Sequence, residues 1–89
     1  MAAVNPWKYD DIYSIIIQYI DKHLGQEQFL LNFGVIALHR TLPRILIRFT
    51  LRKIATNSRI QWEAVIEGNT LSELFTAVKE QVEARKSQL

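Results

Sequence analysis

Residues 44–67 contain two runs in which apolar side chains alternate with side chains that are polar except for Leu46 and Val65, and a short polar segment separates the runs. Strict alternation is typical of a β-strand with one buried and one exposed face, because successive side chains point to opposite sides of a strand. The connecting residues 55–58 are rich in turn-forming types. The pattern therefore predicts an antiparallel β-hairpin with strands at 44–53 and 59–67. Its expected buried positions are Ile45, Ile47, Phe49, Leu51, Ile60, Trp62, Ala64 and Ile66.

One register of this hairpin agrees with both of its faces. Pairing Phe49 with Trp62 brings two aromatic rings together on the apolar face. A shift by one residue would turn every side chain to the wrong face, so we expect the hairpin to adopt this register. The other pairs that it creates are Leu51 with Ile60, Arg48 with Glu63 and Arg44 with Glu67.

Helix-start signals lie near both ends of the chain. The Thr70 hydroxyl can accept a hydrogen bond from the backbone of Glu73, whose carboxylate reaches back, as in a capping box. Asn5 and Pro6 predict the start of a first helix, and Gly25 is expected to end it in a left-handed conformation. Apolar residues recur at helical spacing after both starts. They are Trp7, Ile12, Tyr13, Ile16, Tyr19, Ile20 and Leu24 in the first segment, and Leu71, Leu74, Phe75, Val78 and Val82 in the last.

Residues 26–40 fit two kinds of structure. Their apolar residues lie at helical spacing, which favours a helix over this segment. The run 33–39 also suits a buried strand, because periodicity alone cannot assign a short apolar run. Pro43 ends either element. The residues at helical spacing are Phe29, Leu30, Phe33, Ile36 and Ala37.

The chain length of 89 residues corresponds to one domain, and a hydrophobic fraction of 48% is enough to form a core. We therefore predict a single α+β domain over residues 1–89, with the order α-α-β-β-α and the helices packed on the apolar face of the hairpin. The alternative order is α-β-β-β-α, with residues 33–39 as a further strand. A two-stranded sheet is marginal and its edges must be covered or paired, so strand addition in a homodimer is one expected solution.

The segment Glu67-Gly68-Asn69-Thr70-Leu71-Ser72-Glu73-Leu74 resembles the strand–G-x-T-x-x-E–helix junction of HicB-like antitoxin domains. The resemblance covers under a third of the chain, and a helix break with a capping box accounts for it, so no residue or function is carried over. The alternative order α-β-β-β-α resembles the double-stranded-RNA-binding domain in outline. The basic residues of that family at the start of its second helix are missing here, where Glu73 stands instead.

The sequence carries no motif for catalysis, cofactor binding or metal binding. It contains no cysteine, which excludes disulfides and fits a reducing compartment. His23 is expected to interact with the dipole at the end of the first helix, and His39 to be a loop or partly buried residue. No segment has the form of a signal peptide or a membrane span. We expect a cytoplasmic protein that is not an enzyme and has no cofactor, metal or small-molecule substrate.

Positive charge is concentrated in the middle of the chain. Residues 40–59 contain six basic residues and no acidic one, whereas both flanking segments have more acidic than basic residues. The predicted register pairs two of the arginines with glutamates and leaves a basic hairpin tip. This tip is a candidate site for phosphate or nucleic acid, and the other interpretations are an acidic protein partner or strand-end cations that prevent aggregation. The candidate residues are Arg52, Lys53 and Arg59, together with Arg40.

Aromatic side chains gather on the first predicted helix, where Trp7, Tyr9 and Tyr13 are candidates for a protein interface. Packing of these rings over the hairpin is the other interpretation. Our leading prediction is a non-enzymatic protein–protein interaction module, which would be a small regulatory protein, an adaptor or a subunit of a larger assembly. The expected partner is a protein, and a second copy bound through the sheet edge or the first helix is one form of it. Nucleic-acid binding by the hairpin tip is the alternative function.

Overall fold

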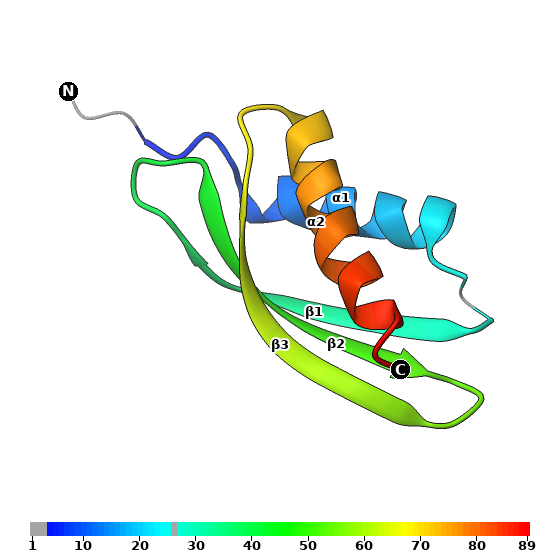
Figure 1. Cartoon of the computed structure of the whole chain (residues 1–89). Helices are drawn as coiled ribbons and strands as arrows, with labels where there is room; N and C mark the ends of the chain where they lie inside the picture. The colour runs from blue at the N-terminus through cyan, green and yellow to red at the C-terminus, as the bar shows by residue number, and fades with distance from the viewer. Residues whose placement is uncertain (1–3, 26) are drawn as a thin grey trace.

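A three-stranded antiparallel sheet forms the centre of the structure, and two helices cover one of its faces (Figure 1). The computed structural model describes residues 4–25 and 27–89. The strands follow one another in the order β1-β2-β3, so β2 lies in the middle and the other two strands form the edges. The elements are α1 (Tyr9–His23), β1 (Phe29–Leu38), β2 (Arg44–Lys53), β3 (Ser58–Glu67) and α2 (Leu71–Lys86).

The α+β class is confirmed, and the order of elements is the alternative one, α-β-β-β-α. The helix favoured over residues 26–40 is wrong, because Phe29–Leu38 forms a strand that pairs with β2. The spacing of the apolar residues is compatible with a helix, but pairing along the middle strand satisfies the backbone groups of this segment and covers one edge of the hairpin. Tertiary structure therefore overrides local periodicity in this segment.

The predicted hairpin and its register are confirmed. β2 pairs with β3 so that Phe49 lies opposite Trp62, and their ring centroids are 5.2 Å apart. On the other face Arg48 Nη2 lies 2.8 Å from Glu63 Oε1, and Arg44 Nε lies 3.0 Å from Glu67 Oε2. Both ion pairs are about half exposed, so each contributes roughly 0–1 kcal/mol and mainly favours the register.

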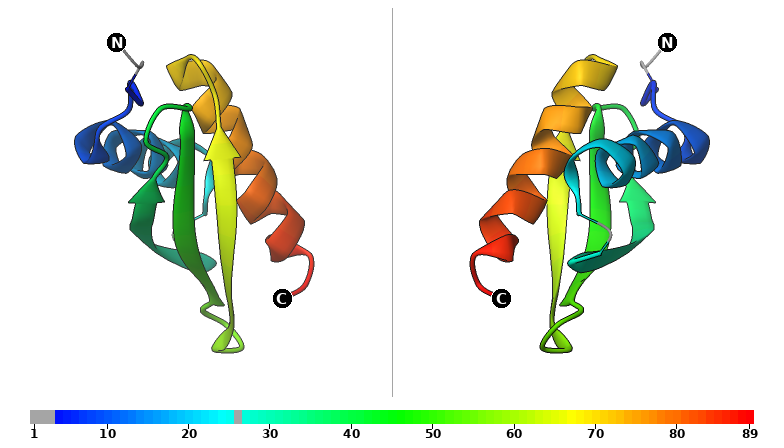
Figure 2. Two further views of the ribbon diagram at one scale, coloured as in Figure 1. Left: turned by 90° about the vertical axis from the view of Figure 1, so that its left-hand side faces the viewer. Right: turned by 90° about the vertical axis from the view of Figure 1, so that its right-hand side faces the viewer.

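Both helices pack on the face of the sheet that carries the alternating apolar residues of β2 (Figure 2). α1 lies on the side of β1, and α2 lies on the side of β3. Within the part of the chain that the structure describes, the opposite face of the sheet carries no helix, and it is called the open face below. The fully buried side chains of the core are Ile12, Ile16, Tyr19, Ile45, Ile47, Phe49, Leu51, Ile66, Leu74, Val78 and Val82.

The prediction that Asn5 caps the first helix is wrong. The cap position is Lys8, whose backbone N–H donates to the Asp11 carboxylate at 3.0 Å. The Asn5 side-chain amide instead donates to the carbonyl oxygens of His39 and Arg44, which ties the segment before α1 to the turn between β1 and β2. Gly25 does not end α1 in a left-handed conformation, since its φ is not positive. The cap residue is Leu24, which is extended.

The start of α2 is as expected. The Thr70 hydroxyl accepts a hydrogen bond from the backbone N–H of Glu73 at 3.1 Å. The Glu73 carboxylate reaches back and accepts from the backbone of Asn69, one residue before the cap. The capping box therefore marks the true beginning of the last helix.

A hydrogen bond between Tyr19 and Glu83 joins the two helices. The buried Tyr19 hydroxyl donates to Glu83 Oε1 at 2.9 Å. Burial raises the pKa of Tyr19 above its ordinary value, and the neighbouring carboxylate adds to this. Desolvation alone would raise the pKa of Glu83, but the hydrogen bond from Tyr19 and the charge of Lys86 lower it overall. The bond therefore keeps Tyr19 neutral and Glu83 ionised where α1 crosses α2.

Candidate functional site

β1 is an edge strand without any charged side chain. All ten of its residues, FLLNFGVIAL, are uncharged, and among residues 4–25 and 27–89 β2 is the one strand that pairs with it. The other edge strand, β3, carries Arg59, Glu63 and Glu67. Natural sheets protect exposed edges with charges, prolines or bulges, because unpaired backbone groups there bind other strands. β1 has such protection at one end only, where an irregularity interrupts its pairing between Val35 and Ala37.

An apolar stripe of α1 lies beside this edge. Tyr9, Tyr13 and Ile17 are four residues apart and therefore share one side of the helix, with exposed fractions of 51%, 47% and 48%. The Tyr13 ring lies 4.8 Å from the Phe33 ring of β1. In both views of Figure 2 the N-terminal half of α1 extends sideways past β1. We call this region the edge surface, which consists of Tyr9, Tyr13, Ile17, Leu30, Phe33 and Val35.

The open face of β1 has one protruding and one empty position. Leu30 is 40% exposed on this face. Gly34 lies four residues further along β1 on the same face. It has open space where a side chain would stand, since an added Cβ would meet no atom within 4 Å. A hollow of about 390 Å³ lies there, next to Asn32 and Arg48. The edge strand thus presents a large apolar side chain and a hollow on the same face, about 13 Å apart along the strand.

The basic residues of the hairpin tip lie together, as the sequence predicts. Arg52 and Arg59 stand directly opposite each other in the register of β2 and β3. Arg52 Nη1 donates to the Asn57 side-chain oxygen at 3.1 Å, and Asn57 adopts a left-handed conformation with φ of 57° in the turn. The three ion pairs found among residues 4–25 and 27–89 do not include Arg52, Lys53 or Arg59. Two like charges therefore face each other across the sheet.

Arg40 lies far from this tip. It belongs to the turn before β2, whereas the tip follows the end of β2, and a strand of this length spans about 33 Å. The Arg40 carbonyl accepts a hydrogen bond from the Asn5 backbone at 3.1 Å, which fixes its turn. The four predicted basic residues therefore form two separate regions in one chain.

Trp7 differs from the two tyrosines predicted with it. Its indole N–H donates to the Gly68 carbonyl at 2.8 Å, and its half-buried ring packs against the core. Trp7 thus ties the N-terminal segment to the turn before α2. Tyr9 and Tyr13 remain exposed and belong to the edge surface.

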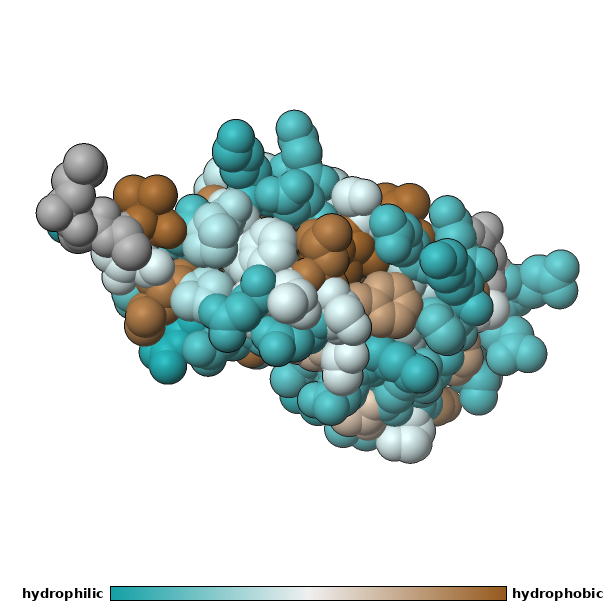
Figure 3. Space-filling model, turned by 90° about the horizontal axis from the view of Figure 1, so that it is seen from above, coloured by the Kyte–Doolittle hydropathy of each residue, from teal (hydrophilic) through white to brown (hydrophobic). Residues whose placement is uncertain are grey.

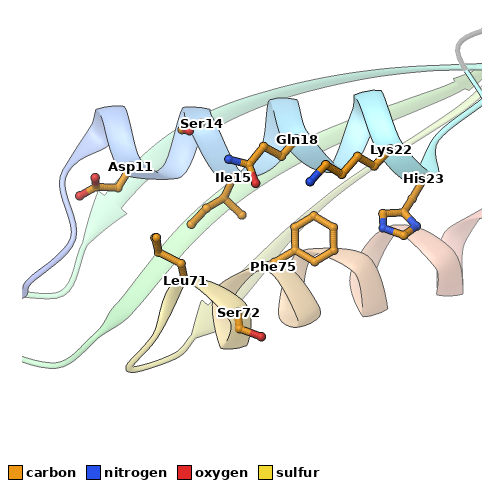
Figure 4. A pocket seen from close by; sticks show the side chains of 9 residues that line it. All are labelled: Asp11, Ser14, Ile15, Gln18, Lys22, His23, Leu71, Ser72 and Phe75. Atoms are coloured by element: carbon orange, nitrogen blue, oxygen red, sulfur yellow. The ribbon is translucent and has the colours of Figure 1, made fainter.

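A groove of about 370 Å³ lies between α1 and α2 (Figure 4). Its apolar lining residues are Ile15, Leu71 and Phe75, and polar side chains of both helices line the rest. Seen from above, this side of the molecule shows brown and tan side chains in the middle with teal ones around them (Figure 3). The ring of His23 lies 5.3 Å from that of Phe75, so the histidine packs against the groove wall. The groove residues of α1 lie on the opposite flank of the helix from Tyr13.

His39 shapes a turn. Its Nδ1 accepts hydrogen bonds from the backbone N–H groups of Thr41 at 3.1 Å and of Leu42 at 2.9 Å. Both bonds fold the chain between β1 and β2. His39 therefore lies in a loop, which is one of the two positions expected for it.

The sequence pattern alone does not mark Ile17, Leu30, Phe33 or Val35 as parts of a site. The sequence does contain an indication of this site. Residues 28–38 contain no charge, and the predicted helix before them carries several aromatic residues. The signal becomes readable once this segment is known to be an edge strand rather than a helix. Strand order is a property of the tertiary structure, so the sequence pattern does not show it.

Comparisons with protein-family models, curated proteins and solved structures give no match for this chain. Neither α1 nor α2 is long and apolar enough to span a membrane.

Proposed function

We propose that the protein is a non-enzymatic protein–protein interaction module of the cytoplasm, acting as a small regulatory protein, an adaptor or a subunit. Its binding site is the edge surface, and it binds a partner polypeptide by adding a strand to β1. The observation that carries this proposal is an edge strand of ten residues without a charge, in a protein whose other edge is charged. Such an edge is an aggregation hazard unless a partner covers it.

Strand addition uses the backbone for affinity and the side chains for specificity. A strand placed beside β1 would form hydrogen bonds with its unpaired backbone groups. The half-buried rings and aliphatic chains of Phe33 and Val35 would then lose their remaining exposure to water. Tyr13 of α1 would cover the same partner from above, since it already contacts Phe33.

A charge placed on this edge should abolish partner binding. Leu30→Lys puts a cation on the exposed edge of β1, which opposes strand addition without disturbing a buried group. We expect affinity capture from native extract to recover bands with wild-type bait that are lost with Leu30→Lys bait. Gln61→Lys is the matched control, because it makes the same kind of change on the open face of β3. Equal capture by all three baits would contradict the proposal.

A second candidate function is nucleic-acid binding by the hairpin tip. The observation that favours it is the pair Arg52 and Arg59, which face each other although like charges directly opposite are destabilising. A phosphate between them would relieve this repulsion and would accept hydrogen bonds from both guanidinium groups. The start of α2 gives no support, because Ser72 and Glu73 stand there.

A salt titration tests this second candidate. If the tip binds phosphates, the association constant for a nucleic acid should fall steeply with salt, and Arg59→Glu should weaken binding at least tenfold at low salt. Arg44→Gln, at the other end of β2, is the control and should change binding little. Absence of binding at low ionic strength would exclude this function for the tip.

A further inference from the structure

We infer that the partner strand at β1 is β1 of a second copy of this chain, paired antiparallel about a two-fold axis at Asn32. This inference rests on the proposed function, and it names the occupant of the same edge surface. The resulting sheet would have six strands, in the order β3-β2-β1-β1-β2-β3. Both copies would place their helices on the same side of this sheet, because a two-fold axis perpendicular to a sheet preserves its faces.

The limits of the regular part of β1 select the register. β1 pairs with β2 without interruption from Phe29 to Val35, and the irregularity follows directly. Asn32 is the midpoint of this regular segment. An isologous interface repeats each contact about its axis, so the longest regular pairing of two β1 strands is centred on Asn32.

The open face is self-complementary in this register. Leu30 of one copy stands opposite Gly34 of the other copy, and the contact occurs twice. The exposed leucine side chain would enter the hollow beside Gly34, where no atom lies within 4 Å of an added Cβ. Directly opposite residues of an antiparallel pair have Cβ positions about 5 Å apart, which is within reach of a leucine. The two Asn32 side chains would meet on the axis, where amide groups can donate and accept in turn.

The helix-covered face also fits a second copy. The register places Leu31 opposite Phe33 and Phe29 opposite Val35, so each pair on this face is apolar. The overhanging part of α1 lies in the helix layer and leaves the edge of β1 open in the plane of the sheet (Figure 2). Tyr13, which contacts Phe33 from this layer, would then cover Leu31 of the second copy.

Charge argues for a second copy rather than a different protein. The edge surface contains no ionisable group except the tyrosine hydroxyls, so it presents no charge that calls for an opposite charge on a partner. An uncharged apolar strip is complementary to itself, whereas a charged strip repels its own copy.

Cysteine cross-linking tests the register, because the chain has no cysteine of its own. In Asn32→Cys the two sulfur atoms would meet on the axis, at a Cα separation within the range of a disulfide. We expect mild oxidation of this variant to give a disulfide-linked dimer as the main product. Gln61→Cys is the matched control, since Gln61 lies in the same rung of the open face but on the opposite edge strand. It should form at least tenfold less dimer under the same conditions.

The mass of the purified protein in solution completes the test. Wild type should have twice the chain mass of 10.4 kDa, and Leu30→Lys should have the mass of one chain while its thermal unfolding stays cooperative. A monomeric wild type, or a Gln61→Cys variant that cross-links as well as Asn32→Cys, would overturn the inference. In that case, capture from extract that still depends on Leu30 would leave strand addition to β1 by another protein intact. If the wild type is monomeric and capture from extract does not depend on Leu30, the proposed function is contradicted as well.

Discussion

Replacing Phe49 by alanine should lower the free energy of unfolding by about 3–5 kcal/mol, which is the usual cost of truncating a buried phenylalanine. Phe49 is fully buried in the middle strand, and its ring stacks on the ring of Trp62. The substitution removes this ring contact and leaves a cavity that the strand cannot close, because β1 and β3 hold it on both sides. The native state of a small domain is stable by only about 5–15 kcal/mol, so the loss should be large in urea denaturation.

Val65→Ala is the control for this prediction. Val65 lies on the open face of β3 and is 57% exposed, so its truncation should cost less than about 1 kcal/mol. Both variants remove apolar atoms from the sheet, but only Phe49→Ala removes them from the helix-covered face. Equal losses in the two variants would contradict the assignment of that face as the core.

A methyl group at Gly68 should destabilise the protein by about 1–3 kcal/mol, the range for overpacking of a close contact. An added Cβ would lie 2.7 Å from the Cβ of Glu73 and 2.9 Å from the backbone nitrogen of Leu74. The first turn of α2 cannot give way easily, since the Thr70 cap holds it. Movement of Gly68 instead would disturb the hydrogen bond that its carbonyl accepts from Trp7. Thermal unfolding of Gly68→Ala measures the effect.

Gly34→Ala provides the matched comparison. Gly68 lies between β3 and α2, whereas Gly34 lies within β1. An added Cβ at Gly34 meets nothing within 4 Å. In the Leu30→Lys background, which removes the leucine that would enter this hollow from a second copy, we expect Gly34→Ala to leave the midpoint of thermal unfolding unchanged or slightly higher than in Leu30→Lys alone, because alanine reduces the conformational freedom of the unfolded chain. If Gly68→Ala lowered the midpoint no more than Gly34→Ala does in that background, the close approach of the 68–70 turn to α2 would be wrong.

Only part of the edge surface can be predicted from the sequence. Tyr9 and Tyr13 are visible as candidates because they are aromatic residues on a predicted helix. Trp7 has the same appearance in the sequence, yet its indole donates to Gly68, which lies 61 residues further along the chain. No local pattern reports such a contact. The same limit applies to Arg40, because a basic residue near three others in sequence lies at the far end of the strand in space.

The sequence by itself determined the hairpin. The alternation of Ile45, Ile47 and Phe49 with Arg44, Leu46 and Arg48 is a local property. In one register with the second run, apolar pairs share a face, and Arg44 and Arg48 each lie opposite a glutamate. The capping box at Thr70 is equally local and places the start of α2. These features are settled by the residues within a few positions of one another, so the sequence pattern is sufficient for them.

Only the tertiary structure decided the state of residues 29–38 and the character of the site. Their apolar spacing fits a helix and a strand alike, and the free edge of the hairpin selects the strand because it offers backbone partners along its whole length. Once β1 is an edge strand, its lack of charge becomes the most informative property of the protein. The hairpin therefore follows from local alternation, whereas the binding surface follows from which strand lies at the edge of the sheet.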